Sequence, residues 1–536
     1  MEFIHHILSQ EKNTQKTALV FPQSAVTLTY AELFEQCVRL SHAFQSQAVL
    51  PGSRIVILLP NSPEFIIALF AIMKVGGVAI PLDTFAKKSE ILDILNLINP
   101  RLIVTNQSLS RKIRRDLSIN TRICLLNFST EKRGIWYRFT EFHAVVPSKS
   151  ASDKDKNPKD DLHFSTITPQ NDALFILTSG STGAPKAVRL SHESVLCNVR
   201  MHLNSLRIDS DIIGLQVLPM NYSYGLIASF LSILYSQGTV IFTTDLQAKL
   251  IIQHINRFKV NLLVGTPTFF HYIFDKVSIK NSDAHARESA VPDEEKIYLS
   301  MDSLRYITLG GDKCPPNLLN LIRKKLSNVR VYVTYGLTEA GPRVSTLPPE
   351  YISTRPHSIG IPLNGIEVKI IKEHGKICLP YEMGEIVVRT PSVMNGYFGN
   401  EEKTAKVLQD GWFYTGDLGW ADKEGFLYFG GRKDMTFKIN GKKINPSLIE
   451  DCICSHLSIE TCRIHKVKED TTEYIRATIK LTEITSDTLI DELKRICRQK
   501  LPAYMIPKDF TLDDQHYYFK GQVDQSLQIP QADRKL

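Results

Sequence analysis

Short apolar segments alternate with stretches of helical pattern over much of the first 340 residues of this chain. The clearest unit predicts a strand at residues 54–59, a helix at 62–75 and a second strand at 77–82. The same alternation returns at residues 214–218, 223–236, 239–244, 247–258, 261–265, 304–309, 316–326 and 330–334. Strand–helix–strand units of this size are typical of parallel sheets with helices on their faces, so the predicted fold class is α/β.

The pattern changes from about residue 344 onward. Residues 367–371, 376–378 and 385–389 are predicted as strands, and Gly375 and Gly384 mark turns beside them. This indicates a β-rich region over about residues 344–430. Past Arg432 the pattern predicts a short α+β tail, with strands at 436–439, 461–467 and 474–481 and helices at 446–456 and 487–500.

Composition and charge exclude several classes of protein. Apolar residues make up 43% and charged residues 22% of the 536 residues, which is typical of globular chains. The formal net charge of +8 is small for this length and no run of five basic residues occurs, so nothing indicates nucleic-acid binding. The nine cysteines form no CxxC pair and the N-terminus lacks the apolar core of an export signal, so we expect reduced thiols in the cytoplasm.

The longest apolar stretch, residues 65–82, is close to the shortest length that spans a bilayer. Lys74 interrupts this stretch and Pro81 closes it. We interpret it as a buried helix that runs into a buried strand, and we therefore expect no membrane span.

One loop carries the clearest chemical signal. It runs from Thr178 through Ser179, Gly180, Ser181, Thr182 and Gly183 to Lys186, between two apolar segments. Glycines let backbone N–H groups turn toward an anion, hydroxyls donate hydrogen bonds, and a lysine neutralises charge, so the loop suits a phosphate. It lacks the Gly-Lys-Ser/Thr of a Walker A motif, and taken alone such a loop is also typical of a plain turn.

The context of this loop decides between these two interpretations. The loop resembles the phosphate loop of the adenylate-forming (AMP-binding) enzymes, which include acyl- and aryl-CoA ligases, luciferases and peptide-synthetase adenylation domains. Further segments match this family in the same order, at residues 334–339, 411–417, 430–434 and 441–450. Five ordered motifs extend the resemblance over nearly the whole chain, and they imply ATP and Mg²⁺ as cofactors, with CoA or phosphopantetheine as the acceptor.

The resemblance also implies roles for individual residues. Tyr335 would lie on the adenine, Thr338 would contact the α-phosphate, and the carboxylate of Glu339 would bind Mg²⁺, which prefers hard oxygen ligands. Asp417 would bind the ribose and Arg432 would contact the nucleotide. Without the other motifs, these residues are equally typical of a helix cap, a turn aspartate and a solvated arginine.

The resemblance divides the chain into two domains. It implies a large N-terminal AMP-binding domain over residues 1–431, including the β-rich part, and a small mobile C-terminal domain over residues 432–536. Asp434 lies at the family's hinge, about which the small domain rotates between an adenylating and a thioester-forming position. Gly441 resembles the glycine beside the tunnel for the pantetheine thiol, with a simple turn glycine as the alternative.

The pocket for the acid is less clearly marked. Asn221 and Tyr222 occupy the place where many relatives carry an aromatic residue and a histidine, and Gly310 and Gly311 are expected to form another wall. A partly polar pocket argues against a long, plain fatty acid. For Arg343 three roles stay open: contact with an acidic group of the substrate, bracing of a loop, or exposure on the surface.

His192 begins the helix expected after the phosphate loop. Capping or packing of this helix and a catalytic role are both open for it. The spacing of the histidines and acidic residues resembles no protein-ligated metal site.

The sequence departs from the family near its C-terminus. Relatives carry a lysine there that bridges the acid and ATP, whereas this chain has Gln522 in the segment from Phe519 to Asp524. A neutral amide supplies no cation, and the loss of one preorganised electrostatic donor lowers an enzymatic rate by roughly 10²–10³. Three explanations are open: Lys520 replaces the missing lysine, adenylation is slow, or the chain binds nucleotide without turnover.

The resemblance implies an ATP-dependent acid–thiol ligase. A small carboxylic acid would become an acyl-adenylate, and a thiol of CoA or of an acidic acyl carrier protein acting in trans would then accept the acyl group. One alternative is a catalytically impaired nucleotide-binding relative, which Gln522 suggests. Another is an oxidative, luciferase-like enzyme, which nothing in the sequence favours.

Overall fold

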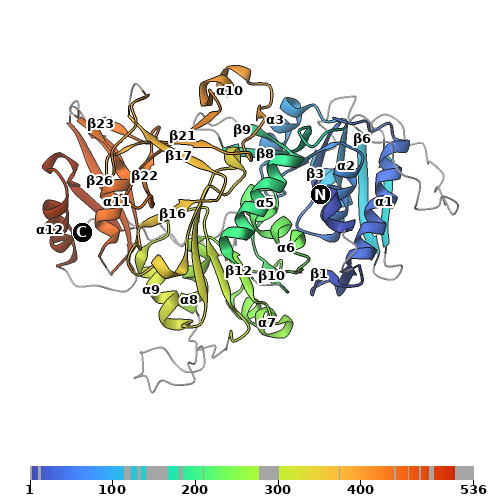
Figure 1. The fold of residues 1–536 in the computed structure, drawn as a ribbon, viewed down its shortest axis with the longest axis horizontal. Coiled ribbons are helices and arrows are strands. Elements are labelled where there is room, and N and C mark those ends of the chain that lie inside the picture. Colours follow the sequence, from blue (N-terminus) through green and yellow to red (C-terminus); the bar gives the residue numbers. More distant parts are fainter. Residues whose placement is uncertain are drawn as a thin grey trace.

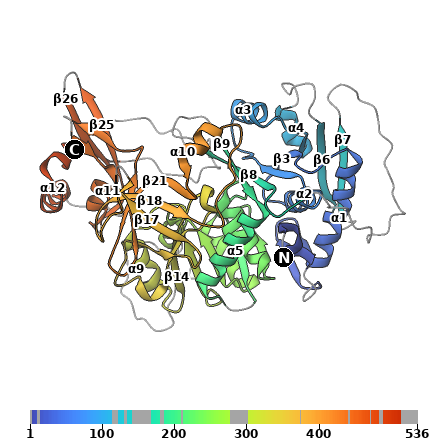
Figure 2. The same ribbon diagram turned by 45° about the horizontal axis from the view of Figure 1, so that its top comes forward.

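The computed structural model describes residues 3–9, 14–113, 122–129, 134–140, 167–179, 185–208, 211–276, 301–372, 375–439, 442–456, 458–469, 472–481 and 488–512. In this part of the chain, two large mixed sheets with flanking helices form the body, and a smaller α+β unit lies at one end of the long axis (Figures 1 and 2). The prediction of an α/β fold is confirmed.

The larger sheet has 14 strands and joins the two predicted regions of the body. Its parallel strands are β1 (Thr17–Phe21), β11 (Thr239–Phe242), β10 (Ile213–Gln216), β12 (Leu262–Gly265), β13 (Tyr306–Leu309) and β14 (Arg330–Tyr335), with β2 (Val26–Thr29) antiparallel to β1. The strands of the β-rich region follow, at β15 (Ser345–Leu347), β16 (Ser358–Pro362), β22 (Leu427–Arg432), β21 (Trp412–Ala421), β20 (Leu408–Gln409), β18 (Gly384–Arg389) and β17 (Glu367–Ile371). Because β15 pairs with both β14 and β16, the β-rich region continues the parallel sheet and does not form a sheet of its own.

The second sheet has eight strands. In spatial order they are β19 (Gly396–Tyr397), β9 (Pro185–Ser191), β8 (Asp172–Ser179), β4 (Val78–Pro81), β3 (Arg54–Leu58), β5 (Leu102–Thr105), β6 (Arg122–Ser129) and β7 (Gly134–Thr140). β19 comes from the β-rich region, so this two-residue strand links the two sheets of the body.

The body contains the helices predicted at residues 62–75, 223–236, 247–258 and 316–326 and the helix expected from His192, together with helices that were not predicted. They are α1 (Tyr30–Ser46), α2 (Pro63–Lys74), α3 (Lys88–Ile98), α4 (Gln107–Ile113), α5 (His192–Leu206), α6 (Ser232–Tyr235), α7 (Ala248–Phe258), α8 (Pro267–Lys276), α9 (Pro316–Lys325) and α10 (Glu401–Val407). Local signals explain the ends: Ser62 accepts a hydrogen bond from the N–H of Phe65 at the start of α2, and Pro63 takes the first helical position.

The apolar stretch at residues 65–82 forms α2 and β4, both of which are buried in the body. This is the helix-to-strand interpretation made from the sequence. Of the helices that the structure describes, none has the length and hydropathy that crossing a bilayer requires.

One local prediction was wrong, and one predicted helix is partly of another type. Residues 376–378 were predicted as a strand, but this segment makes only the single bridge between Ile371 and Ile377. The helix predicted at residues 223–236 is helical throughout, but Tyr224–Leu231 forms a π-helix before α6 begins. Periodicity of apolar residues cannot distinguish a π-helix from an α-helix when nearly all positions are buried, as here for all except Tyr224.

The C-terminal unit has a hydrophobic core of its own, which includes Ile444, Ile453, Leu493 and Phe510. Its elements are β23 (Phe437–Ile439), β24 (Lys442–Ile444), α11 (Pro446–Cys454), β25 (Ile459–Glu469), β26 (Thr472–Leu481), α12 (Leu489–Lys500) and β27 (Asp509–Leu512). The unit meets the body through an ion pair between Lys313 and Asp451. Separate cores support the predicted boundary at residue 431, which stays a prediction.

Candidate active site

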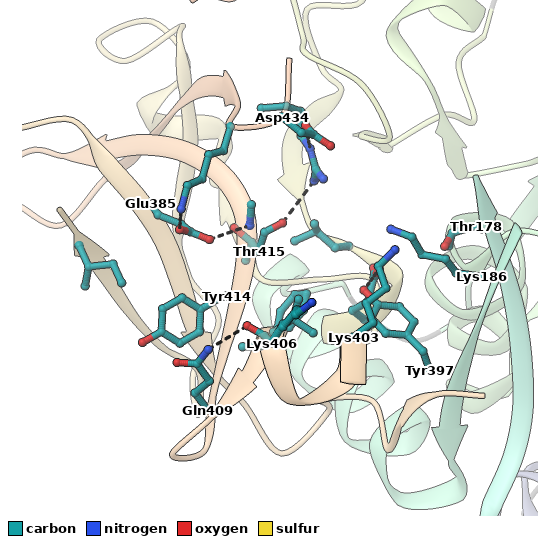
Figure 3. A pocket seen from close by; sticks show the side chains of 18 of the residues that line it. Thr178, Lys186, Glu385, Tyr397, Lys403, Lys406, Gln409, Tyr414, Thr415 and Asp434 are labelled. Carbon is teal, nitrogen blue, oxygen red and sulfur yellow. Dashed lines mark hydrogen bonds and ion pairs between the residues drawn. The ribbon is translucent and has the colours of Figure 1, made fainter. Parts of the chain in front are cut away.

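A cleft of about 820 Å³ opens between the two sheets, beside α10 (Figure 3). One side of the cleft carries Thr178, Lys186, Glu339, Tyr397 and Lys403. The other side carries Thr415, Arg432 and Asp434. Residues from the matched motifs, which extend along the chain from Thr178 to Asp434, therefore line one space.

The phosphate loop connects two antiparallel strands. Thr178 on β8 pairs with Lys186 on β9, and the loop residues Gly180, Ser181, Thr182 and Gly183 lie outside the described residues. Ser179 is the last residue of β8. The hairpin places Thr178 and Lys186 at the edge of the cleft, as the predicted phosphate loop requires.

β19 brings a tyrosine to this edge. Tyr397 pairs with Val188 on β9, and the N–H of Phe398 donates to the carbonyl of Ala187 at 2.9 Å. The hydroxyl of Tyr397 donates to Oε1 of Glu339 at 2.9 Å. Tyr397 therefore fixes one oxygen of the carboxylate that was predicted to bind Mg²⁺.

Glu339 and Thr338 belong to a short 3₁₀ turn (Thr338–Ala340) that follows β14. The hydroxyl oxygen of Thr338 lies 2.7 Å from that of Ser223. In the described residues no group of three or more His, Cys, Asp or Glu side chains is arranged to hold a metal ion. Glu339 and Thr338 nevertheless offer the hard oxygen atoms that Mg²⁺ prefers, so they fit the ion when nucleotide phosphates complete its ligands.

Two lysines face the ring of Tyr397. Nζ of Lys186 lies 5.7 Å and Nζ of Lys403 lies 5.8 Å from its centroid. Figure 3 shows the two side chains extending toward one another, one from β9 and one from α10. Burial, and then the neighbouring charge of Lys186, lower the pKa of Lys403 to about 8.

A second cluster, which we call the adenosine-side cluster, consists of Tyr335, Asp417 and Arg432. The hydroxyl of Tyr335 donates to Oδ2 of Asp417 at 2.6 Å, and Nη1 of Arg432 donates to Oδ1 at 2.8 Å. Asp417 is only 3% exposed. Burial raises the pKa of its carboxyl group, and the charge of Arg432 opposes that rise.

Strand register explains this cluster. Asp417 on β21 and Arg432 on β22 are paired residues of neighbouring antiparallel strands, so their side chains lie on the same face. Arg432 also donates through Nε to Oδ1 of Asp434 at 3.3 Å. Arg432 therefore binds both Asp417 and the predicted hinge residue, Asp434. Asp434 is exposed and lies at the edge of the cleft.

The predicted walls of the acid pocket come together around Tyr224. A Cβ atom added at Gly310 would lie 3.3 Å from the Tyr224 ring, and one added at Gly311 would lie 3.1 Å from it. The hydroxyl of Tyr224 donates to the carbonyl of Gly265 at 3.0 Å. Of the other predicted pocket residues, Asn221 is half-buried and Tyr222 is 45% exposed.

Arg343 is buried, so the prediction that it might lie on the surface was wrong. Its side chain is 2% exposed, and its guanidinium carbon lies 4.1 Å from the centroid of the Tyr224 ring. Nη1 donates to the carbonyl of Pro342 at 3.0 Å, whereas Nε and Nη2 have no hydrogen-bond partner in the described part of the chain. Burial lowers the pKa of this guanidinium.

Several predicted site residues are not part of this geometry. Gly441, Lys520 and Gln522 lie outside the described residues. His192 is buried at the start of α5, where its Nδ1 accepts a hydrogen bond from the N–H of Ile4 at 3.3 Å. These contacts favour the packing role for His192.

The sequence interpretation missed Tyr397 and Lys403. Tyr397 follows a turn at Asn395 and Gly396, and Lys403 stands in a charged segment that reads as a solvated helix face. Only the pairing of β19 with β9 brings both residues to the cleft, and pairing between short, distant strands leaves no periodic signal in the sequence.

Comparison with known proteins shows the family to which this chain belongs. The model of the AMP-binding enzyme family matches residues 8–398 of the chain. The 2-succinylbenzoate–CoA ligase of Bacillus subtilis (strain 168) is 27% identical over 501 residues, which are 93% of this chain and 92% of the relative. A long-chain-fatty-acid–CoA ligase of the same organism is 26% identical over 517 residues, covering 92% of this chain and 88% of that protein.

Solved structures give the same result. The o-succinylbenzoate CoA synthetase of Bacillus subtilis with ATP and magnesium ion superposes with a TM-score of 0.75, at 25% identity and with 96% of each chain covered. The same enzyme with its acyl-adenylate intermediate OSB-AMP gives a TM-score of 0.74, covering 96% of this chain and 94% of that one. An anthranilate CoA ligase is 20% identical, covers 96% of this chain and 93% of its own, and shares the fold with a TM-score of 0.79.

Proposed function

Because the chain belongs to the AMP-binding enzyme family and is an AMP-forming acid–thiol ligase, we propose that it activates a small carboxylic acid with ATP and transfers the acyl group to CoA. The observation that carries the proposal is the cleft itself. It brings the phosphate-loop lysine, the predicted Mg²⁺ carboxylate and Arg432 into one space, and Arg432 holds Asp417 of the adenosine-side cluster beside it.

The first step forms an acyl-adenylate. A carboxylate oxygen of the acid attacks the α-phosphorus of ATP, the bond to the bridging oxygen of the β-phosphate breaks, and pyrophosphate leaves. Lys186 neutralises phosphate charge, and the hydroxyl of Thr338 donates to the α-phosphate. Mg²⁺, held by Glu339, would supply charge neutralisation for the triphosphate.

The adenosine-side cluster holds the other half of the nucleotide. The carboxylate of Asp417 is already fixed by Tyr335 and Arg432, so it can accept hydrogen bonds from ribose hydroxyls without reorganising. The ring of Tyr335 lies at the end of β14 and provides a surface for the adenine.

The second step transfers the acyl group. The CoA thiolate attacks the acyl carbon, and AMP leaves with the electron pair of the broken anhydride bond. We propose that the C-terminal unit (residues 432–536) rotates about Asp434 between the two steps, and that Gly441 then lies beside the pantetheine arm. The separate core of this unit and the exposed position of Asp434 support such a movement.

The acid pocket favours a compact acid. Tyr224 packs against Gly310 and Gly311 and closes the wall that these glycines form. The named relatives use an aromatic dicarboxylic acid and a long-chain fatty acid, and the packed aromatic wall favours the first kind. CoA is favoured over a carrier protein as the acceptor, because both relatives are CoA ligases.

The alternative is a catalytically impaired relative that binds nucleotide without turnover. The observation behind it is Gln522, which removes a cation that relatives use in adenylation. Lys520 stays the proposed replacement.

Acid-dependent exchange of pyrophosphate into ATP tests both candidates. We expect exchange with at least one acid of a panel that includes 2-succinylbenzoate, benzoate and palmitate. The rate should fall by roughly 10²–10³ in Lys186→Ala. Lys249→Ala, an exposed lysine on α7, should leave the rate unchanged. ATP binding without exchange for any acid would instead support the impaired relative.

A further inference from the structure

Lys403 is the residue of the cleft that the family motifs leave without a role. It lies on α10, and its side chain extends toward that of Lys186 beside the ring of Tyr397. Neither ammonium group forms an ion pair with a carboxylate in the described part of the chain, although Glu339 lies close enough to act on Lys403 electrostatically. Two cations therefore share one nearby carboxylate.

The position of Lys403 is set by several specific contacts. Oδ1 of Asn400 accepts from the N–H of Lys403 at 2.9 Å and caps α10. The hydroxyl of Thr404 accepts from the N–H of Tyr397 at 2.9 Å and donates to the carbonyl of Asn400 at 2.9 Å. The start of α10 is thus tied to β19, and β19 is paired with the strand that carries Lys186.

Two other lysines near Lys403 are arranged differently, because each forms an ion pair with a glutamate. Lys406, one turn further along α10, forms an ion pair with Glu402 at 2.6 Å and is 69% exposed. Lys433 forms an ion pair with Glu385 at 2.8 Å. Lys403, by contrast, is half-buried and directed at another lysine. Two ammonium groups this close repel each other, so the arrangement is stabilised only when an anion lies between them.

We propose that Lys403 and Lys186 together bind the β- and γ-phosphates of ATP, and thus the pyrophosphate that leaves, so that Lys403 is a further binding residue of the reaction. The inference rests on the proposed function, because it assigns the leaving-group end of the same site. The Pα–O bond that breaks in adenylation places negative charge on pyrophosphate, and two ammonium groups stabilise that charge. Relatives carry a lysine at the position of Gln522, so this chain lacks one cation of the family there. Lys403 supplies a cation at a different place, beside the leaving pyrophosphate.

Equilibrium binding by isothermal titration calorimetry tests this assignment without knowledge of the acid. The probes are ATP, pyrophosphate and AMP, each with Mg²⁺, on the full chain. In Lys403→Met we expect the Kd for ATP and for pyrophosphate to rise about tenfold, the lower end for a hydrogen bond to a charged group. The Kd for AMP, which lacks these two phosphates, should stay within about twofold. Methionine keeps most of the stem that packs on Tyr397.

Two further variants complete the design. Lys249→Met, at an exposed lysine on α7 that does not line the cleft, should bind all three ligands like the wild type. Lys403→Arg should restore most of the ATP affinity, because it restores the cation. Equal weakening of ATP and AMP in Lys403→Met, or no weakening at all, would overturn the inference. Failure of the wild type to bind either nucleotide would overturn the proposed function and the inference with it.

Discussion

Charged side chains are arranged differently at the two ends of the cleft: opposite charges are paired at one end, and like charges lie together at the other. At the adenosine-side cluster, the buried carboxylate of Asp417 has a partner on each oxygen, Tyr335 at 2.6 Å and Arg432 at 2.8 Å. At the phosphate end, Lys186 and Lys403 approach each other beside the ring of Tyr397. The charge of Asp417 is therefore paired without a ligand, whereas the two lysines at the phosphate end need an anion to balance their charges.

This difference matches the chemistry of the nucleotide. Ribose and adenine are neutral, so the protein must supply paired charges that hold them and stay stable in their absence. The triphosphate brings its own negative charge, so the protein needs only to supply cations. We therefore expect substitutions at the adenosine-side cluster to lower the stability of the body. Substitutions at the phosphate end should lower the affinity for polyphosphate and the reaction rate without lowering stability.

The largest stability effect should come from Arg432→Met. It leaves the carboxylate of Asp417 buried without its cation, and we expect the free energy of unfolding to fall by about 2 kcal/mol at pH 8, less than for a fully buried pair because Arg432 is half-exposed. Urea denaturation followed by tryptophan fluorescence measures this, since all three tryptophans precede residue 432 and report on the body.

The pH dependence of the same variant provides an internal control. Burial already raises the pKa of Asp417 above 3.8, and loss of Arg432 raises it further. The folded state then binds more protons than the unfolded state, so stability falls as the pH rises through this window. The difference between Arg432→Met and the wild type should therefore be smaller at pH 5 than at pH 8. A pH-independent difference would contradict the assigned pairing.

A smaller effect is expected from Tyr335→Phe. This change removes the donor to Oδ2 of Asp417 and keeps the ring, whose centroid lies 6.2 Å from that of Phe429. We expect a loss of about 1 kcal/mol in the same denaturation experiment. A loss larger than that of Arg432→Met would mean that the tyrosine, and not the arginine, is the main partner of Asp417.

The smallest effect should come from Lys186→Met. Removal of one of two facing ammonium groups relieves repulsion, so the free energy of unfolding should stay constant or rise by less than about 0.5 kcal/mol. Denaturation of this variant beside Arg432→Met compares the two ends directly. A loss of stability as large as that of Arg432→Met would remove the distinction between them.

Much of the fold could be predicted because its signals are local. Residues 367–371 were predicted as a strand with the bounds that β17 has, and the helix at residues 316–326 differs from α9 by one residue. The register of β14 against β15 could not be predicted, and this pairing makes the β-rich region part of the larger sheet. Such pairing depends on contacts between segments that no sequence window contains.

The same distinction, between local sequence signals and contacts between distant segments, applies to the residues of the candidate site. Lys186, Glu339, Asp417 and Arg432 were found because they stand in motifs whose order and spacing are specific. The structure brings Lys186, Glu339 and Arg432 to one cleft, and Arg432 binds Asp417. Lys403 was not found, because a lysine beside two glutamates looks like any solvated helix. The burial of Arg343 was not predicted either, since a charged residue in a loop is normally exposed.

The pairing of β19 with β9 also has a consequence for the synthesis of the chain. β9 ends at Ser191, and the strand that covers part of its free edge begins at Gly396, on the order of two hundred residues later. At the usual speed of translation this separation takes roughly 10 to 40 s, during which an open strand edge is available for incorrect pairing. The nascent chain is therefore most vulnerable to aggregation in that interval, which ends when Tyr397 reaches its place beside Lys186.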